Sequence, residues 1–143
     1  GRIKYASDLP FEKVETQPFL DAAAPPRRDR NALGDSLRID GAPVAKGIGM
    51  RSRGRISFAA AGFKRFEAKV ALDDAAGSQG SVRFTVQADD KTVFDSGEMK
   101  PGDPPKDVRV ELTRVRALVL AVEYAKRGDV DDLADWGDAR FVE

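Results

Sequence analysis

The chain has 143 residues, and its 24 lysine and arginine residues balance 24 aspartate and glutamate residues, so the formal net charge is zero. This length predicts a single domain over residues 1–143 with its own hydrophobic core. Without an overall electrostatic field, neither nucleic acid nor an anionic membrane is an expected partner. The chain has no cysteine and no histidine, which excludes disulfides, thiol nucleophiles, histidine-dependent catalysis and most transition-metal sites.

Targeting signals are not evident in the sequence. No stretch approaches the roughly 20 apolar residues that span a bilayer, and the opening GRIKYASDLP lacks the apolar middle of a signal peptide. We expect a soluble domain that belongs to a longer protein, whose targeting signal and attached domains lie elsewhere. The absence of cysteine does not identify a compartment.

The first third of the chain, residues 5–34, mixes short apolar runs with the segments APP and RRDR. Its composition resembles that of a linker. Large apolar residues nevertheless recur in it, and EKVETQPF at residues 12–19 has a strand-like middle. We therefore predict that this part belongs to the domain. RRDR, at residues 27–30, is expected to be a solvated loop held by its own Asp29.

Further along the chain, apolar and polar residues alternate with a period of two, which indicates half-buried strands. The alternation covers residues 64–72, 81–88, 106–112 and 116–125, and RISF at residues 55–58 predicts another strand. The segment 116–125 is apolar on both faces, so we predict that it is a central strand.

The connections between these segments are rich in glycine, proline, aspartate and serine, which favour turns. They are DDAAGSQG, ADDK, SGEMKPGDPP and AKRGDVDD. No apolar stripe of period 3.6 is long enough for a helix, although DVDDLADWGD has room for one turn. Evenly spaced strands without crossover helices predict an all-β fold, an antiparallel β-sandwich or jelly roll.

A cluster of aspartates surrounds the only tryptophan near the end of the chain. Its members are Asp129, Asp131, Asp132, Asp135 and Asp138, and a further pair, Asp73 and Asp74, ends a predicted strand. Calcium takes six to eight oxygen ligands, so a loop dense in aspartate is a candidate cation site, although the EF-hand pattern is not met. The spacing leaves open a solvated loop with local Asx turns.

Two further roles can be weighed for this segment. Glycoside hydrolases place two acids across a cleft, but nothing in the sequence places two acids in an apolar cleft, so we predict no enzymatic activity. Trp136 either stacks on the apolar face of a sugar or packs in the core beside the last strand. The sequence leaves both roles open and favours packing.

A basic, glycine-bearing motif, KGIGMRSRGRISF, covers residues 46–58. It lacks the Lys-Ser/Thr ending of a P-loop, so a phosphate cradle is not favoured. Gly47 and Gly49 are expected to permit a positive φ or a close backbone approach. The arginines, among them Arg51, offer paired donors for vicinal hydroxyls or carboxylates.

Five motifs together carry a resemblance to a known family. They are YASDL, KGIGMRSRGRISF, FKRFEAKVALDD, GSVRFTVQADDKTVFDSGEM and DDLADWGDARFV. In this order the chain resembles the NPCBM family, carbohydrate-binding modules also classed as family 51. The resemblance implies a jelly-roll β-sandwich related to galactose-binding folds, which recognises galactose-containing glycans. It also implies attachment to an exported protein such as a glycoside hydrolase, and a structural calcium ion.

Two departures from the family pattern concern histidine. Many members carry histidine where this chain has Arg51, and another where it has Leu133. If those histidines line the family's glycan site, this chain has changed its ligand or lost the site. The permanent charge of Arg51 would favour an acidic sugar.

These observations lead to one functional prediction with one alternative. We predict a non-catalytic glycan-binding module in an extracellular, periplasmic or cell-surface protein. The predicted glycan ligands are Arg51, Asp135, Trp136 and Arg140, and the resemblance places calcium ligands at Asp73, Asp74, Asp135 and Asp138. The alternative is a protein-interaction or scaffold domain that lost sugar binding. An open polar pocket would favour the first function, and an exposed apolar patch the second.

Overall fold

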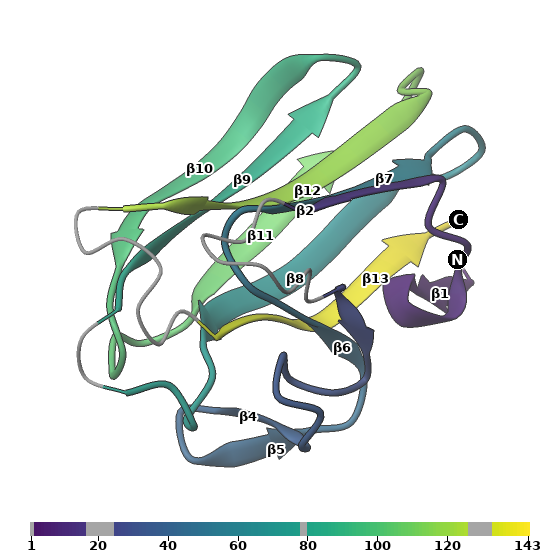
Figure 1. Ribbon diagram of the computed structural model, residues 1–143. Helices are drawn as coiled ribbons and strands as arrows, with labels where there is room; N and C mark the ends of the chain where they lie inside the picture. Colours follow the sequence, from purple (N-terminus) through teal and green to yellow (C-terminus); the bar gives the residue numbers. More distant parts are fainter. Residues whose placement is uncertain (1, 17–24, 78–79, 126–132) are drawn as a thin grey trace.

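The computed structural model describes residues 2–16, 25–77, 80–125 and 133–143. Two antiparallel sheets pack face to face (Figure 1), which is the predicted β-sandwich. The first sheet has the order β11 (Lys106–Glu111), β8 (Arg65–Leu72), β13 (Ala134–Val142), β6 (Gly47–Met50) and β3 (Arg27–Arg28), and β1 (Ile3–Tyr5) also pairs with β13. The second has the order β10 (Lys91–Met99), β9 (Val82–Ala88), β12 (Ala117–Tyr124), β7 (Gly54–Ala59) and β2 (Lys13–Thr16). The described residues also form a hairpin, β4 (Leu37–Ile39) and β5 (Ala42–Val44), and a 3-10 turn, Ala6–Asp8.

The core lies between the two sheets and is built from the inward positions of the alternating strands. The residues predicted to face inward are buried in β8, β9 and β11, and in β12 as far as Val122. Phe58 and Phe66 both pack against Phe141 at ring-centroid distances of 5.3 and 5.1 Å. Burying each such ring contributes roughly 1.5–3 kcal/mol to stability. The period-two pattern therefore identified the inward faces correctly, and β12 is central in its sheet as predicted.

The described part of the first third belongs to the sandwich, as predicted. β2 pairs with β7, and β1 pairs with β13; residues 17–24 lie outside the described part of the chain. The prediction of a solvated loop at residues 27–30 is wrong, because Arg27 and Arg28 form β3. The Arg28 guanidinium donates hydrogen bonds to the carbonyl oxygens of Ser7 (2.7 Å) and Leu9 (2.8 Å), and it lies 3.7 Å from the centre of the Phe11 ring.

β10 is the strand whose extent the sequence pattern did not predict. The segment SGEMKPGDPP was predicted to be a connection, but β10 continues through Met99. Its pairing with β9 shifts register between Thr92 and Phe94 and again between Asp95 and Glu98, and such bulges break the period-two alternation. In the segment DVDDLADWGD, the described residues from Ala134 onward are strand and not a helical turn. No helix in the described part of the chain is long and apolar enough to cross a membrane.

Candidate functional site

Residues 29–45 form an additional layer on the outer face of the first sheet, and glycines make room for it. A Cβ atom on Gly49 would lie 2.5 Å from the Asn31 Cα atom, and one on Gly47 would lie 2.9 Å from the Leu37 Cδ1 atom. On Gly137 it would lie 2.7 Å from the Ile39 Cδ1 atom. Neither Gly47 nor Gly49 has a positive φ. Of the two reasons predicted for these glycines, the close approach is therefore the correct one.

The β4–β5 hairpin within this layer is tethered by the aspartate pair that ends β8. Its two-residue turn, Asp40 and Gly41, has φ values of 52° and 80°, which is the left-handed turn that suits a twisted hairpin. The Gly41 amide donates to the Asp74 carboxylate at 2.9 Å, and the Arg38 amide donates to the Asp73 carboxylate at 3.0 Å. The carboxylates predicted to bind calcium therefore accept hydrogen bonds from the hairpin backbone.

Asn31 organises the loop that precedes the hairpin. Its side-chain amide nitrogen donates to Asp73 at 3.1 Å, and its side-chain oxygen accepts from the amides of Leu33 and Asp35, both at 3.0 Å. Asn31 is buried, so these bonds satisfy groups that water cannot reach. Asn31 was not among the residues predicted from the sequence. The segment NALGD, with its asparagine and glycine, carried the turn signal that could have found it.

Asp135 lies below this layer with an unusual carboxyl group. It pairs in register with Gly49, the residue that Asn31 covers, and its side chain is 0% exposed. Neither of its oxygens accepts a hydrogen bond from a described residue. Burial, followed by the neighbouring Asp73 and Asp74, raises the pKa of Asp135 to about 11. In the absence of a cation, the Asp135 carboxyl group is therefore protonated at neutral pH, and it can donate a hydrogen bond to Asp73.

Asp73 is the charged partner of this pair. Burial acts to raise the pKa of Asp73, but hydrogen bonds from Asp135, from the amides of Arg38 and Ala75 and from Asn31 outweigh burial and lower it. The two carboxyl groups thus share one proton, held on Asp135, and one negative charge, held on Asp73.

The structure does not bring the four predicted calcium ligands together. Asp73, Asp74 and Asp135 are neighbours, but Asp138 lies in a bulge of β13 with φ 55°. Its amide donates to the Lys46 carbonyl at 2.8 Å, and its carboxylate lies 3.3 Å from the Arg140 guanidinium. Within the described residues, no group of three acidic side chains could hold a metal ion. The predicted four-carboxylate set is therefore wrong as a set, because the bulge directs Asp138 elsewhere.

The four predicted glycan ligands do not form one site either. Trp136 is 0% exposed and packs edge-to-face on Phe84 at 5.3 Å, so it is a core residue and cannot stack on a sugar. Asp135 is equally buried. Arg140 lies on the outer face of the first sheet, where it donates to Glu67 at 2.8 Å. It is six residues beyond Ala134 along β13, or about 20 Å from the end of the sandwich near Arg51.

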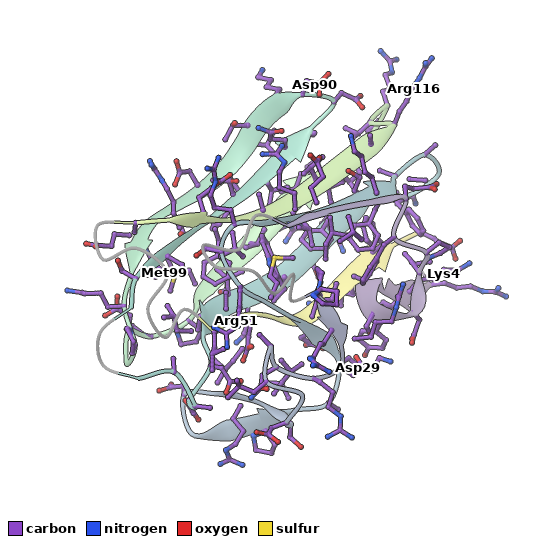
Figure 2. All side chains as sticks on the ribbon, in the orientation of Figure 1. Lys4, Asp29, Arg51, Asp90, Met99 and Arg116 are labelled. Carbon is purple, nitrogen blue, oxygen red and sulfur yellow. The ribbon has the colours of Figure 1, made fainter. Side chains whose placement is uncertain are left out.

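Arg51 remains at the surface, at one end of the sandwich. It is half-buried and follows β6, where the chain crosses to β7 in the second sheet. Figure 2 shows Arg51 well away from Asp90 and Arg116, which lie at the top of the view. Met50 and Leu72 both pair with Ala134, so the chain segments that follow them, Arg51 and Asp73, leave the sheet at the same edge. The acidic segment with Asp129, Asp131 and Asp132 lies outside the described residues.

An open hollow of about 660 Å³ lies at this edge of the first sheet. Its walls are largely polar: Arg30, Asn31, Asp35, Ser36, Arg38, Asp73, Asp74 and Ala75. The hollow is therefore bounded by the Asn31 loop and by the aspartate pair that tethers the hairpin. It offers both hydrogen-bond donors and acceptors, as polyhydroxylated ligands require.

The comparison with known families assigns the chain. The sequence model of the NPCBM/NEW2 domain matches residues 2–142. The chain belongs to the NPCBM/NEW2 family. A relative in Renibacterium salmoninarum, named "Putative endo-alpha-N-acetylgalactosaminidase", is 23% identical over 141 residues. The match covers 96% of this NPCBM domain but only 9% of that relative.

Solved structures of Clostridium perfringens proteins are similar to this NPCBM domain. The CBM51-2 and INT domains of ZmpB match with a TM-score of 0.89 at 28% identity, over 98% of this chain and 31% of that chain. A second structure of these ZmpB domains, with GlcNAc bound to CBM51-2, matches with a TM-score of 0.87. The CBM51 of a GH95 protein, in complex with methyl-galactose, matches with a TM-score of 0.87 at 27% identity, over 99% of this chain and 100% of that chain. This NPCBM domain thus has the fold and the family of a carbohydrate-binding module.

The two positions at which the family resemblance implies histidine, Arg51 and Leu133, differ in their surroundings in this NPCBM domain. Leu133 is 3% exposed, and its carbonyl oxygen accepts a hydrogen bond from the Asp73 amide at 2.7 Å. Leu133 therefore contributes to the interior and offers no surface to a ligand. Arg51 is half-buried. Of the two differences from the family pattern, it is therefore the one that alters the accessible surface.

Proposed function

We propose that this NPCBM domain is a non-catalytic module that binds galactose-type or related glycans. The observation that carries the proposal is the match over the full length of the GH95 module in complex with methyl-galactose. A non-catalytic role is supported by the burial of one carboxyl pair, Asp73 and Asp135. They are 3% and 0% exposed, so a glycosidic bond cannot reach them.

The proposal extends to the protein that carries the module. The curated relative is named as an enzyme, and the match spans 9% of it. We propose that this domain is likewise one part of a larger exported protein, located outside the cell, in the periplasm or on the cell surface. There the module would keep the attached domains close to a glycan.

A protein-interaction domain is the less supported function. Large apolar side chains with high exposure are Ile3, Val14, Leu33 and Val93. They lie on β1, on β2, in the Asn31 loop and on β10, so they do not form one contiguous patch within the described residues. The polar hollow beside Asp73 is the kind of feature expected of a sugar-binding module.

Replacing Arg51 with alanine is expected to weaken glycan binding roughly 10- to 100-fold, because a charge-assisted hydrogen bond to a ligand is lost. Acidic sugars should lose more affinity than neutral galactosides. Arg51→His, which restores the residue common in the family, should shift the preference toward neutral sugars. A glycan array followed by calorimetry with galactosides and uronic acids measures both effects.

Arg116→Ala is the matched control for Arg51→Ala, because Arg116 is exposed at the opposite end of the sandwich. Its affinity should equal that of the unmodified domain. An array on which this domain binds no sugar above background, while a family member with both histidines does bind, would contradict the proposed function.

Calcium stays a prediction, now restricted to the adjacent carboxyl groups of Asp73 and Asp135. The oxygens of Asp135 accept no hydrogen bond from a described residue, so they suit a cation. These carboxylates alone supply fewer than the six to eight oxygens that calcium takes, so carbonyl oxygens or water would complete the set. Calcium at 100 times its dissociation constant is expected to stabilise the domain by about 2.7 kcal/mol. The melting temperature should then rise by several degrees and fall again with EDTA; no shift would count against the site.

A further inference from the structure

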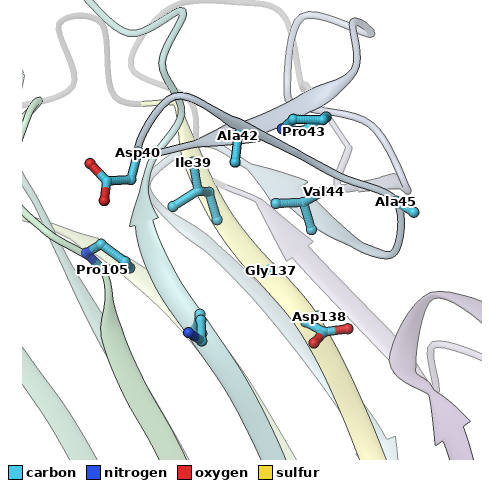
Figure 3. A pocket seen from close by; sticks show the side chains of 10 residues that line it. Ile39, Asp40, Ala42, Pro43, Val44, Ala45, Pro105, Gly137 and Asp138 are labelled. Carbon is cyan, nitrogen blue, oxygen red and sulfur yellow. The ribbon is translucent and has the colours of Figure 1, made fainter.

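A groove of about 490 Å³ separates the β4–β5 hairpin from the outer face of β8 and β13 (Figure 3). This volume is in the usual range for small-molecule sites. Pro43 and Val44 on the hairpin and Pro105 beside β11 give it apolar sides. Arg51 does not line it. It also shares no lining residue with the polar hollow beside Asp73, so the groove is separate from that candidate glycan site.

The walls of the groove are held in place by the protein itself. The hairpin is fixed by the hydrogen bonds from the Gly41 and Arg38 amides to Asp74 and Asp73. Ile39 is buried against Gly137 at the base of the groove, where a side chain on residue 137 would collide with it. A ligand entering the groove would not have to order these walls, which favours affinity.

Polar groups of both signs reach the groove from its sheet side. Asp138 stands in the β13 bulge with φ 55°, and its side chain is 55% exposed. Bulges often redirect a side chain toward a functional surface. Lys69 of β8 is exposed and lines the groove, and its ammonium group has no hydrogen bond or ion pair with a described residue. A carboxylate acceptor and an ammonium donor therefore lie at the same surface.

We propose that this groove binds a 2-acetamido pyranose unit of a glycan. No aromatic side chain lines it, so stacking on a bare hexose ring is not available there, whereas the Pro43 and Val44 side chains suit an acetamide methyl group. Lys69 and Asp138 have opposite charges, which fits a neutral ligand with hydroxyl donors and acceptors better than an ion. This inference rests on the proposed function and adds a second binding position to it.

The surroundings of the groove fit a ligand longer than one sugar. Lys69 and Asp138 also line an adjoining hollow of about 260 Å³, which extends to Glu67, Arg109 and Arg140. A glycan whose acetamido unit occupies the groove has room to continue over the outer face of β8 and β11. Arg140, predicted from the sequence as a glycan ligand, lies on this path.

NMR titration of the ¹⁵N-labelled domain with N-acetylgalactosamine, N-acetylglucosamine and methyl-galactoside tests the inference. The amide signals of Gly41, Gly137 and Asp138 should shift with the acetamido sugars. These sugars should bind at least about fourfold more tightly in the groove than methyl-galactoside, from burial of one methyl group.

Two pairs of variants complete the test. Ala42→Phe, on the exposed hairpin strand that lines the groove, should fill it and reduce acetamido-sugar affinity at least tenfold, while Ala59→Phe, an exposed strand position on β7, should not. Asp138→Asn should weaken binding severalfold. Asp90→Asn is its control, because Asp90 also has a positive φ (69°) and lies at the far end of the sandwich.

The outcomes separate this inference from the proposed function. If acetamido sugars bind but shift only signals near Arg51, and Ala42→Phe keeps full affinity, the groove is not a sugar site and the proposed function stands. If no sugar binds the unmodified domain, both fail. Should Ala42→Phe not fold, unchanged affinity of Asp138→Asn together with unshifted groove amides overturns the inference.

Discussion

An Asp135→Asn variant, measured in EDTA, is expected to be more stable than the unmodified domain at pH 7 by roughly 2–4 kcal/mol. Keeping a proton on a carboxyl group with an ordinary pKa of about 3.9 costs about 1.36 kcal/mol per pH unit, or about 4 kcal/mol at pH 7. Burial beside Asp73 imposes this cost on Asp135. The amide of asparagine has the same shape, needs no proton and can still donate to Asp73, although its second N–H has no evident partner.

The pH dependence of stability should distinguish the two proteins. The folded state keeps the Asp135 proton up to a pKa of about 11, whereas the unfolded chain releases it near pH 4, so the folded state binds more protons in between. The free energy of unfolding of the unmodified domain should therefore fall as the pH rises above 4, and this decline should be absent in Asp135→Asn. Below pH 4 the lowered pKa of Asp73 acts in the opposite direction, and its stabilisation is lost as the pH falls.

Urea denaturation at pH 5, 7 and 9 measures both effects. The control is Asp95→Asn, because Arg83 lowers the pKa of Asp95 on the exposed edge of the second sheet. Neutralising that surface carboxylate should cost up to about 1 kcal/mol, the opposite sign. An Asp135→Asn variant that is less stable than the unmodified domain at every pH in EDTA would contradict a protonated Asp135. Adding calcium should favour the unmodified domain over the variant if the calcium prediction holds.

A Gly49→Ala variant is expected to lose about 3 kcal/mol or more of stability. The added Cβ atom would lie 2.5 Å from the Asn31 Cα atom and equally close to other backbone atoms of that loop. Backbone cannot rotate away as the end of a side chain can, so the loop must lift off the sheet. Lifting it would break the bond from Asn31 to Asp73 and expose Asp135 to water.

Gly62→Ala and Gly137→Ala are the comparison variants for the stability loss of Gly49→Ala. A Cβ atom on Gly62 meets nothing within 4 Å, but its φ is +92°, so alanine there should cost roughly 1–2 kcal/mol from backbone strain alone. Gly137→Ala meets the flexible end of Ile39 and should fall between the two. Chemical denaturation gives the three values. Equal losses of stability for Gly49→Ala and Gly62→Ala would show that the outer layer does not pack closely against Gly49.

The strands of the core were predictable because a strand with one buried face alternates apolar and polar residues along the sequence. Val82, Phe84 and Val86 alternate with polar residues and are buried as expected. β10 escaped prediction because its two register shifts disturb the alternation. Arg28 could not be placed from its neighbours in sequence either, since its partners, Ser7 and Leu9, lie about twenty residues earlier.

The candidate site was less predictable than the core. The sequence pointed to Asp73, Asp135 and the two glycines of KGIG, and the structure does bring them into one region. Their roles depend on the pairing of β13 with β6, which puts Asp135 opposite Gly49 and below Asn31. Composition left a cation site and a solvated loop open, and the family resemblance implied calcium, whereas burial decides which carboxyl group holds a proton. No local pattern encodes that burial.

The attachment of the β4–β5 hairpin has a consequence for changing the ligand preference of this domain by design. The hairpin is joined to the sheet by Leu37 and Ile39, which pack over glycines, and by hydrogen bonds of Arg38 and Gly41 with Asp73 and Asp74. The Gly41 position has open space around it, and the sandwich core lies on the other side of the sheet. Exchange or lengthening of residues 40–44 therefore offers a way to graft new recognition loops onto the outer face without repacking the core between the sheets.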